Sequence, residues 1–394
     1  MFELEEVAPQ EDASGTTVIK VVGVGGAGGN AVEHMIREGV GGVEFICCNT
    51  DSQALDKSSA HVKLQLGPGL GAGGKPEKAR ELAQADRQRI AEVLEGAHMV
   101  FITAGMGGGT GTGAGPVIAE VARELGILTV AVVTKPFEYE GRRKRLAEEG
   151  VTELAQYVDS LIVILNEKLE EVLGDDVSML DAFKAADNVL RNAVGGIAEI
   201  INVPGLVNVD FEDVRTVMGE MGKAMMGSAM ASGVDRARIA AEEAVASPLL
   251  EGVELSGARG VLVNITASNT LGLKEYKDVM NTIRQYTAAE ATVICGAVFD
   301  ESMEDQLRVT VVATGLGAIA GKVRKPEMKV VEAIGLRTGT DNFHVFDTTL
   351  GQVDLSGVAS SLRSNLPRNS QADAMAASGV DKYDIPAFLR RQSD

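Results

Sequence analysis

Short apolar runs alternate with amphipathic stretches along the first half of the chain. Val18–Val24 is an apolar, β-branched run typical of a buried strand, and glycines and a helical pattern over Asn30–Arg37 follow it. The alternation continues, with further strands expected at Val43–Cys48, Met99–Thr103, Leu128–Val133 and Ser160–Leu165 and further helices at Lys75–Leu94, Pro116–Leu125 and Arg142–Tyr157. Buried strands that alternate with helices predict a parallel sheet covered on both faces. Ligands of such sheets bind beyond the carboxyl ends of the strands.

One long helix is expected next. Ser178 can cap its first turn, with Asp181 three residues on. Apolar residues then recur with a helical period until the pattern stops before Pro204. Such a helix has about 24 residues and is therefore about 36 Å long.

The pattern changes beyond this helix. A Met-rich helix at Phe211–Met226 is followed by a helix, a strand, a helix and two strands, expected at Arg236–Ala246, Gly260–Ala267, Tyr276–Ala288, Thr292–Phe299 and Leu307–Thr314. This order predicts a second, α+β domain. The expected organisation is a disordered leader at 1–16, a parallel-sheet domain at 17–177, the central helix at 178–203, the α+β domain at 204–317, a linker at 318–380 and a terminal peptide at 381–394.

Composition excludes several classes of protein. The net charge of −19 argues against nucleic-acid binding, which needs a basic surface, and no apolar run is long enough to span a membrane. The acidic first 14 residues lack the apolar core of a signal peptide. The three cysteines show neither a metal-ligand spacing nor a disulfide framework, so we expect buried thiols in a reducing cytoplasm.

Glycine is in excess, and much of it follows two of the predicted strands. Gly23, Gly25 and Gly28 fit G-x-G-x-x-G between a strand and a helix, a pattern in which bare backbone and a helix N-terminus bind phosphate. Asp51 follows the next strand, where dinucleotide enzymes carry a ribose-binding acid. This loop alone is therefore compatible with a dinucleotide-dependent oxidoreductase, or with a tight turn that binds nothing.

The second glycine loop favours a triphosphate. Six of the nine residues in Gly105–Gly113 are glycine, and we interpret this as backbone kept bare for a ligand, because glycine is costly elsewhere. Two loops surround more phosphate than one does, and the Walker motif G-x-x-x-x-G-K-[ST] is absent. Backbone N–H groups would hold most of the phosphate charge, which suits an acidic protein.

Four segments resemble motifs of the tubulin/FtsZ superfamily and, within it, of the FtsZ family of bacterial cell-division GTPases. They follow one another along the chain in the same order as in that family. They are Gly107–Gly113 (GGGTGTG), Thr134–Phe137 (TKPF), Asn208–Asp213 (NVDFED) and the C-terminal Asp384–Arg391. The resemblance covers about residues 17–317 and the tail. It implies an α/β fold with a Rossmann-like parallel-sheet GTP-binding domain, a long central helix, a second α+β domain and a flexible tail. It also implies a cytoskeletal GTPase that hydrolyses GTP to GDP with Mg²⁺.

The nucleotide contacts follow from the resemblance and, for the base, from the residues themselves. The phosphate-binding positions are Gly25, Gly26, Ala27, Gly28, Gly29, Asn30, Gly107, Gly108, Gly109, Thr110 and Gly111, and Asn166 and Glu140 match contacts to the base and to the ribose or a phosphate. Phe183 and Asp187 share a helix face. The ring can stack on a purine, and the carboxylate can accept the N1–H and amino hydrogens of guanine.

The sequence does not decide which basic residue contacts the nucleotide. The family commonly has arginine four residues after the glutamate, where this chain has Lys144, and Arg143 and Arg145 flank that position. Lysine cannot make the planar two-pronged contact of arginine. Arg143, Lys144 and Arg145 therefore all stay candidates for the cation that contacts the nucleotide.

The acidic residues Asp210 and Asp213, with Asn208, are expected to act on the γ-phosphate, although Asp210 can equally cap the next helix. Asp187 and Pro204 are 17 residues apart on the helix, which is about 26 Å. Acids beyond Pro204 would therefore reach the nucleotide of another subunit rather than their own. Head-to-tail contacts of this kind build filaments, and the resemblance implies GTP-dependent protofilaments that form the Z ring beneath the inner membrane at mid-cell.

The terminal peptide Asp384–Arg391 combines apolar and basic residues, as a groove-binding motif does, although a frayed chain end is the alternative. It resembles the FtsZ-family tail that binds membrane tethers such as FtsA and ZipA, and division regulators are further expected partners. Two other functions stay open on the sequence: the oxidoreductase, and a nucleotide-binding regulator without catalysis. Competition among GTP, ATP and NAD separates the oxidoreductase from the other two.

Overall fold

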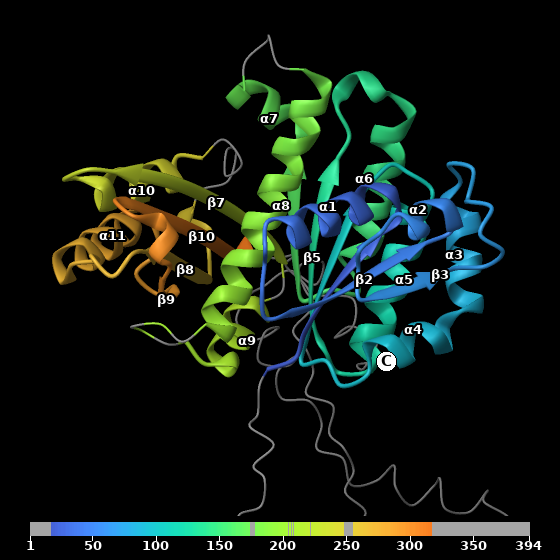
Figure 1. The fold of residues 1–394 in the computed structure, drawn as a ribbon, viewed down its shortest axis with the longest axis horizontal. Helices are drawn as coiled ribbons and strands as arrows, with labels where there is room; N and C mark the ends of the chain where they lie inside the picture. The colour runs from blue at the N-terminus through green and yellow to red at the C-terminus, as the bar shows by residue number, and fades with distance from the viewer. Residues whose placement is uncertain are drawn as a thin grey trace, which may run out of the picture. The chain divides into compact units, whose positions relative to one another are not determined.

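The computed structural model describes residues 17–316, apart from 174–177, 204, 206, 208, 221 and 248–254. The expected leader, linker and terminal peptide, together with Pro204 and Asn208, lie outside the described residues. Within them, one sheet carries helices on both faces (Figure 1).

In the described part of the chain, ten strands pair in the order β3–β2–β1–β4–β5–β6–β7–β10–β8–β9. Neighbours from β3 to β7 are all parallel, whereas β10 is antiparallel to both β7 and β8. The strands are β1 (Ile19–Val24), β2 (Val43–Asn49), β3 (Val62–Gln65), β4 (Met99–Gly105), β5 (Leu128–Lys135), β6 (Ser160–Leu165), β7 (Gly222–Ser232), β8 (Gly260–Ala267), β9 (Thr292–Phe299) and β10 (Gln306–Leu316). The parallel half confirms the predicted Rossmann-like sheet.

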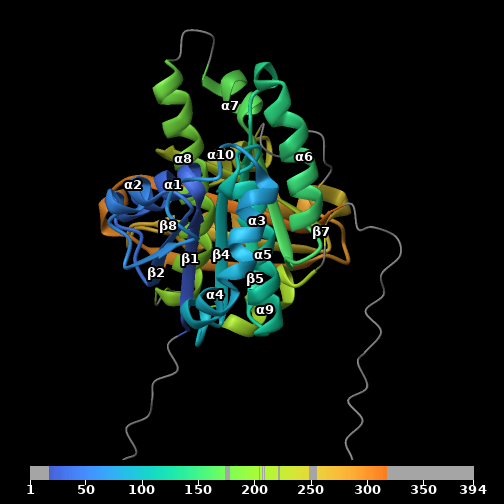
Figure 2. The same ribbon diagram turned by 90° about the vertical axis from the view of Figure 1, so that its right-hand side faces the viewer.

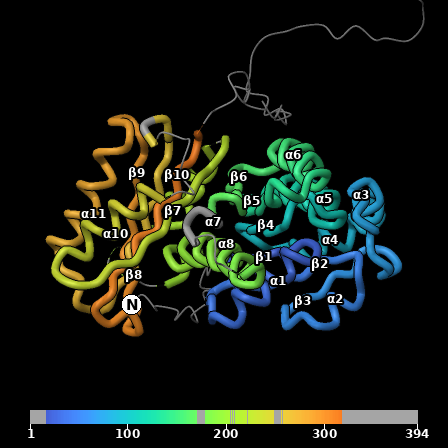
Figure 3. The backbone as a smooth tube through the Cα atoms, turned by 90° about the horizontal axis from the view of Figure 1, so that it is seen from above, coloured from blue at the N-terminus to red at the C-terminus, as the bar shows by residue number. Residues whose placement is uncertain are grey.

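Helices cover the two faces of this sheet in separate layers. α1, α8 and α9 bury apolar residues against one face, and α3 to α6 do so against the other, while α10 and α11 cover the C-terminal strands (Figures 2 and 3). The helices are α1 (Gly25–Arg37), α2 (Ser52–Asp56), α3 (Pro76–Ala85), α4 (Arg87–Leu94), α5 (Thr110–Glu124), α6 (Arg142–Leu154), α7 (Asn166–Leu173), α8 (Met179–Asn202), α9 (Phe211–Met218), α10 (Arg236–Val245) and α11 (Leu273–Tyr286), with a short 3-10 turn η1 (Glu138–Glu140).

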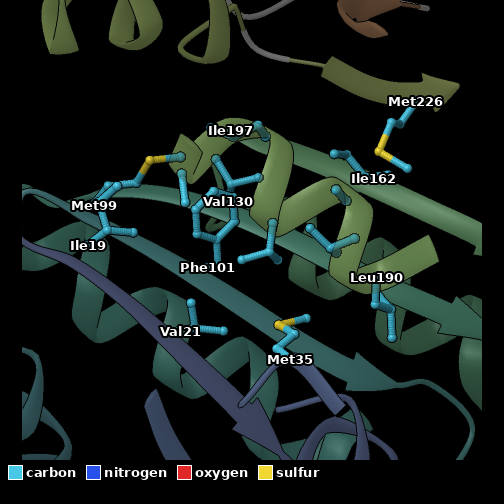
Figure 4. Close-up of a cluster of buried hydrophobic side chains, with 14 of the residues drawn as sticks. Ile19, Val21, Met35, Met99, Phe101, Val130, Ile162, Leu190, Ile197 and Met226 are labelled. Carbon is cyan, nitrogen blue, oxygen red and sulfur yellow. The ribbon is translucent and has the colours of Figure 1, made fainter. Parts of the chain in front are cut away.

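The central helix α8 matches the predicted long helix. Ser178 caps it by accepting a hydrogen bond from the Asp181 N–H at 3.2 Å. Its apolar stripe packs on the sheet, where Leu190 and Ile197 meet a core that includes Phe101 (Figure 4). These side chains are almost wholly buried, and each contributes about 1.5–3 kcal/mol of hydrophobic stabilisation.

Some elements differ from the sequence prediction. The predicted helix Phe211–Met226 is wrong beyond Met218, because the Met-rich residues that follow form β7 between β6 and β10. Met and Ala favour helices in isolation, but the ladders on both sides of β7 decide its structure. The predicted helix Lys75–Leu94 is broken at Asp86, whose carboxylate accepts the Gly67 N–H at 2.8 Å.

The two halves of the sheet are joined by a short ladder. Among the described residues, β6 and β7 pair over Ser160–Ile162 and Gly222–Ala224. The Ser160 hydroxyl reinforces this joint by donating to the Met218 carbonyl at 2.6 Å in the buried interior. The sheet is thus continuous through both halves, and the domain boundaries expected from the sequence stay predictions.

Candidate functional site

The two glycine loops lie side by side at one edge of the sheet. β1 and β4 are adjacent parallel strands, with Val24 opposite Ala104, so their carboxyl ends lie together. Gly25 has a φ of +76°, and a Cβ atom built on it would lie 3.0 Å from the Gly111 nitrogen. The loops therefore touch, and the approach depends on glycine.

Packing explains several of these glycines. A Cβ atom on Gly28 would lie 2.3 Å from the Thr103 carbonyl oxygen, and one on Gly113 would lie 2.0 Å from the Pro76 carbonyl oxygen. Gly107 has a φ of +93°, and a Cβ atom built on it would clash with the Arg143 carbonyl oxygen. The interpretation that the second loop is bare only for a ligand is therefore incomplete. Gly26, in contrast, is exposed, and a Cβ atom built on it would meet nothing within 4 Å among the residues that the structure describes.

Each glycine loop leads into the first turn of a helix. α1 begins at Gly25 and α5 at Thr110, each earlier than the predicted starts at Asn30 and Pro116. Neither helix has a side-chain cap or an acidic residue in its first turn, whereas α2, α8 and α9 are each capped by a side chain. Two uncapped helix N-termini at one edge favour an anion there.

Hydroxyl groups hold the loops in place. The Thr50 and Thr110 hydroxyl oxygens are 2.7 Å apart, and the Gly107 N–H donates to the Thr112 hydroxyl at 2.9 Å. Sequence reasoning missed Thr50, although it follows β2 at the same edge. Asp51, the expected ribose-binding acid of the oxidoreductase alternative, instead caps α2 by accepting the Gln53 N–H at 2.9 Å.

The predicted base contacts lie on two neighbouring elements. Asn166 follows the carboxyl end of β6 and is 6% exposed, yet its Oδ1 atom has no hydrogen-bond partner among the described residues. Phe183 is half-exposed on α8, with its ring edge-on to Phe137 at a centroid distance of 6.1 Å. Burial raises the pKa of Asp187 to about 6.

Charged residues at the start of α6 complete this edge. Glu140 accepts the Phe137 N–H at 3.1 Å and forms an ion pair with Arg143. Lys144 pairs instead with Glu138. The structure therefore gives Arg143 and Lys144 different partners.

The acidic residues occupy the start of α9. Asp210 caps this helix by accepting the Asp213 N–H at 2.8 Å, which confirms the capping alternative for Asp210. The side chain of Asp213 is exposed. The third expected residue, Asn208, lies outside the described residues.

α9 lies at the edge of the sheet opposite the glycine loops (Figures 1 and 2). Phe211 packs edge-on to His98, with ring centroids 6.1 Å apart, and Arg215 donates to the Gly126 carbonyl at 3.3 Å. His98 immediately precedes β4, and Gly126 lies two residues before β5, so α9 sits at the amino ends of these strands. β4 has seven residues, which puts its two ends about 20 Å apart.

No helix in the described part of the chain is both long and apolar enough to cross a membrane. Among these residues no group of three or more His, Cys, Asp and Glu side chains is placed to hold a metal ion.

Comparison with known proteins matches both halves of the sheet. The Tubulin/FtsZ family, GTPase domain, matches residues 18–174, and the FtsZ family, C-terminal domain, matches residues 222–317. The cell division protein FtsZ of Azotobacter vinelandii is 54% identical over 399 residues, and that of Pseudomonas aeruginosa is 54% identical over 407 residues. Both alignments cover 100% of each chain. The chain belongs to the FtsZ family.

Solved structures agree with this assignment. An FtsZ dimer from M. jannaschii superposes with a TM-score of 0.73 at 43% identity, covering 76% of this chain and 88% of that one. The GTPγS-bound CetZ2 protofilament from Haloferax volcanii has a TM-score of 0.64 at 20% identity, over 77% of this chain and 94% of that one, which shows a shared fold.

Membership of the FtsZ family makes this chain a GTPase. The oxidoreductase and the non-catalytic regulator considered from the sequence are therefore wrong. A guanine nucleotide fits the site: Gly26 leaves exposed backbone at an uncapped helix N-terminus, and the buried Asn166 Oδ1 lacks a donor that a base can supply.

Proposed function

We propose that this FtsZ-family GTPase binds GTP at the glycine-loop edge and polymerises head-to-tail, so that each nucleotide is hydrolysed at a junction between two subunits. The phosphates lie on Gly25–Asn30 and Gly107–Gly111. Guanine stacks on Phe183 and donates hydrogen bonds to Asp187 and Asn166, and Glu140 accepts from the ribose or contacts a phosphate.

One observation carries this proposal. The glycine loops lie at the carboxyl ends of β1 and β4, whereas Asp210 and Asp213 lie at the amino ends of β4 and β5. A single chain cannot bring these acids to its own terminal phosphate across about 20 Å of strand. If the edge of one subunit that carries the acids meets the glycine-loop edge of the next subunit, the contact is heterologous and repeats as a filament.

The chemistry at the junction is positioning and electrostatics. The carboxylates of Asp210 and Asp213, with Asn208, orient the attacking water and accept its proton, while the helix N-termini of α1 and α5 stabilise charge on the phosphates. Mg²⁺ would offset phosphate charge when it is bound together with the nucleotide. This chain contributes the carboxylates from one subunit and the N–H groups from the other.

Mixing two inactive variants tests the shared site. Asp213→Ala removes the attacking acid, and Asp187→Ala removes the guanine acceptor. Each alone should release little phosphate, but a 1:1 mixture contains junctions in which an intact nucleotide site meets an intact acid, so phosphate release should recover in part. Wild type mixed with the double variant is the matched control, and co-sedimentation checks that both chains enter the polymer. No recovery in a mixed polymer would contradict a shared site.

The relatives are named cell division proteins, and we place this chain in the same process. Filaments of it would form the Z ring beneath the inner membrane at mid-cell and recruit division regulators. The peptide Asp384–Arg391 would bind a tether such as FtsA or ZipA, because apolar and basic side chains side by side suit a groove with an acidic rim. Many tails along one filament would add avidity.

A further inference from the structure

The helix that carries the acids, α9, is held differently at its two ends. At its C-terminal end, the Val217 carbonyl accepts a hydrogen bond from the Thr314 hydroxyl at 2.7 Å, and the Met218 carbonyl accepts one from the Ser160 hydroxyl at 2.6 Å. Both hydrogen bonds are buried, and the side chains of Val217 and Met218 belong to the apolar core. This end of α9 is therefore fixed in the interior, whereas Asp210 lies at the other end.

The first turn of α9 is held through its aromatic residue. Phe211 is half-buried, and its ring meets the His98 ring edge-on, with the ring centroids 6.1 Å apart. The Arg215 guanidinium lies over the Phe211 ring, 5.8 Å from its centroid, where the π-face attracts a cation. Arg215 also donates to the Gly126 carbonyl at 3.3 Å. His98 and Arg215 thus both act on the ring of Phe211.

His98 belongs to the parallel half of the sheet. Its N–H donates to the Val18 carbonyl at 2.9 Å, its carbonyl accepts the Leu128 N–H at 3.1 Å, and its Nδ1 atom accepts the Val18 N–H at 3.0 Å. The imidazole is therefore attached to the amino ends of β1, β4 and β5. Its contact with Phe211 consequently fastens the first turn of α9 to this half of the sheet.

The position of the acids is sensitive to how this turn is held. α9 has eight residues and is therefore about 12 Å long. A tilt of about 10° about its C-terminal end would move Asp210 by about 2 Å. Displacement of a reacting group by about 1 Å can slow a reaction about a hundredfold. A small loss of support at Phe211 should therefore be felt in hydrolysis.

We propose that His98 and Arg215 hold the ring of Phe211 and are thereby positioning residues for GTP hydrolysis. They keep the acids of α9 where these meet the nucleotide of the next subunit. This inference rests on the proposed function of Asp210 and Asp213. His98 and Arg215 lie at the amino ends of the strands, away from the glycine loops, so their loss slows hydrolysis and leaves the binding of GTP to the same chain unchanged.

Two substitutions of His98 separate its ring contact from its hydrogen bond to Val18. His98→Phe keeps an aromatic ring against Phe211 and should release phosphate at the wild-type rate. His98→Asn keeps an acceptor for the Val18 N–H but loses the ring, and should slow phosphate release about tenfold at saturating GTP. Arg215→Ala tests the same support from a different element and should be slowed by a similar factor. Phosphate release is measured per polymerised subunit, with the polymer quantified by sedimentation.

Nucleotide affinity and stability show whether hydrolysis alone is affected. All three variants should bind GTP as wild type does and unfold cooperatively on heating. Thr216→Ala is the matched control, because Thr216 is exposed on the same helix and its hydroxyl donates within that helix, to the Glu212 carbonyl at 2.9 Å. This control should turn over GTP at the wild-type rate. Because His98 and Arg215 act on one ring, the double variant should be no slower than the slower single variant.

Mixed polymers assign the defect to one edge of the subunit. His98→Asn keeps its glycine-loop edge, so a mixture with Asp187→Ala, whose acids are correctly placed, should release phosphate faster than His98→Asn alone. A mixture of His98→Asn with Asp213→Ala should show no such recovery, because neither chain then presents correctly placed acids. A chain with a general folding defect would recover in neither mixture.

Three results would overturn the positioning role: wild-type turnover in His98→Asn or in Arg215→Ala, slow turnover in a folded His98→Phe, or weakened GTP binding in any of the three. Normal turnover in Asp213→Ala would instead refute the proposed function, and this inference with it. Slow turnover in Asp213→Ala together with normal turnover in His98→Asn would refute the positioning role alone.

Discussion

At the scale of single residues, two glycines of the loops separate packing from ligand binding. The space for a Cβ atom at Gly113 is taken by the Pro76 carbonyl of α3, and the space at Gly26 is open. Both are glycines in glycine-rich loops, so their spacing alone does not distinguish them. The atoms that surround each Cα atom decide whether an added methyl group would disturb packing or ligand binding.

We expect Gly113→Ala to lower the melting temperature by several degrees, since overpacking of this kind costs about 1–3 kcal/mol. Gly26→Ala should keep the wild-type melting temperature and lose GTP affinity, because the methyl group occupies space that a phosphate needs. Thermal unfolding and nucleotide binding on both variants check this. Equal melting temperatures for the two variants would show that the contact between α3 and α5 tolerates a side chain.

Asp187 predicts a pH dependence of base recognition. Burial raises its pKa to about 6, although His34 and Arg37 partly offset the shift. Only the ionised carboxylate accepts both guanine hydrogens, so the affinity should be full well above pH 6 and fall as the pH drops through about 6.

Guanosine is the suitable ligand for this measurement, because it carries no phosphate that titrates in this range. Its affinity for wild type should fall between pH 7 and pH 5, whereas Asp187→Asn should bind weakly and with no change over the same range. A wild-type affinity that stayed constant to pH 5 would contradict the role of the ionised carboxylate.

At the scale of elements, the start of α9 combines a structural and a proposed catalytic task. The Asp210 carboxylate caps the helix through the Asp213 N–H, and the same carboxylate is expected at the subunit junction. An amide oxygen can also cap a helix, but it cannot accept a proton from water.

Two substitutions at Asp210 separate these tasks. Asp210→Asn should keep the melting temperature and slow phosphate release, whereas Asp210→Ala should also lose about 1 kcal/mol of stability with the cap. Thermal unfolding and phosphate release on both variants test this. Normal turnover in Asp210→Asn would leave Asp210 with the capping role alone.

The elements that the sequence predicted best are those set by local pattern. Within β6, Leu161–Leu165 is an unbroken apolar run, and α8 has both a cap and a regular apolar stripe, so short-range rules suffice. The starts of α1 and α5 were missed because glycine disfavours helices locally, and here the contact between the two loops holds those turns in place. β7 was missed because Met and Ala favour helices locally, whereas the strands that pair with it are distant in sequence.

At the scale of the whole molecule, the proposed filament depends on the described residues and not on the terminal peptide. A chain truncated after residue 380 should therefore polymerise with GTP as the full chain does, and should fail to bind a tether. Light scattering with and without GTP, alongside a pull-down with FtsA or ZipA, measures both properties. Failure of the truncated chain to polymerise would give the tail a role in assembly.

The sequence by itself determined the fold class, the two phosphate loops, the long helix and the candidate acids, because these depend on short-range patterns and motifs. Only the tertiary structure decided which glycines are required by packing and that the backbone of Arg143 lies against Gly107. The burial of Asp187, which raises its pKa to about 6, also comes from the tertiary structure. The fold also placed the glycine loops at the carboxyl ends of β1 and β4 and the acids at the amino ends of β4 and β5. Burial and the position of strand ends arise from contacts between residues far apart in the chain, which local spacing does not encode.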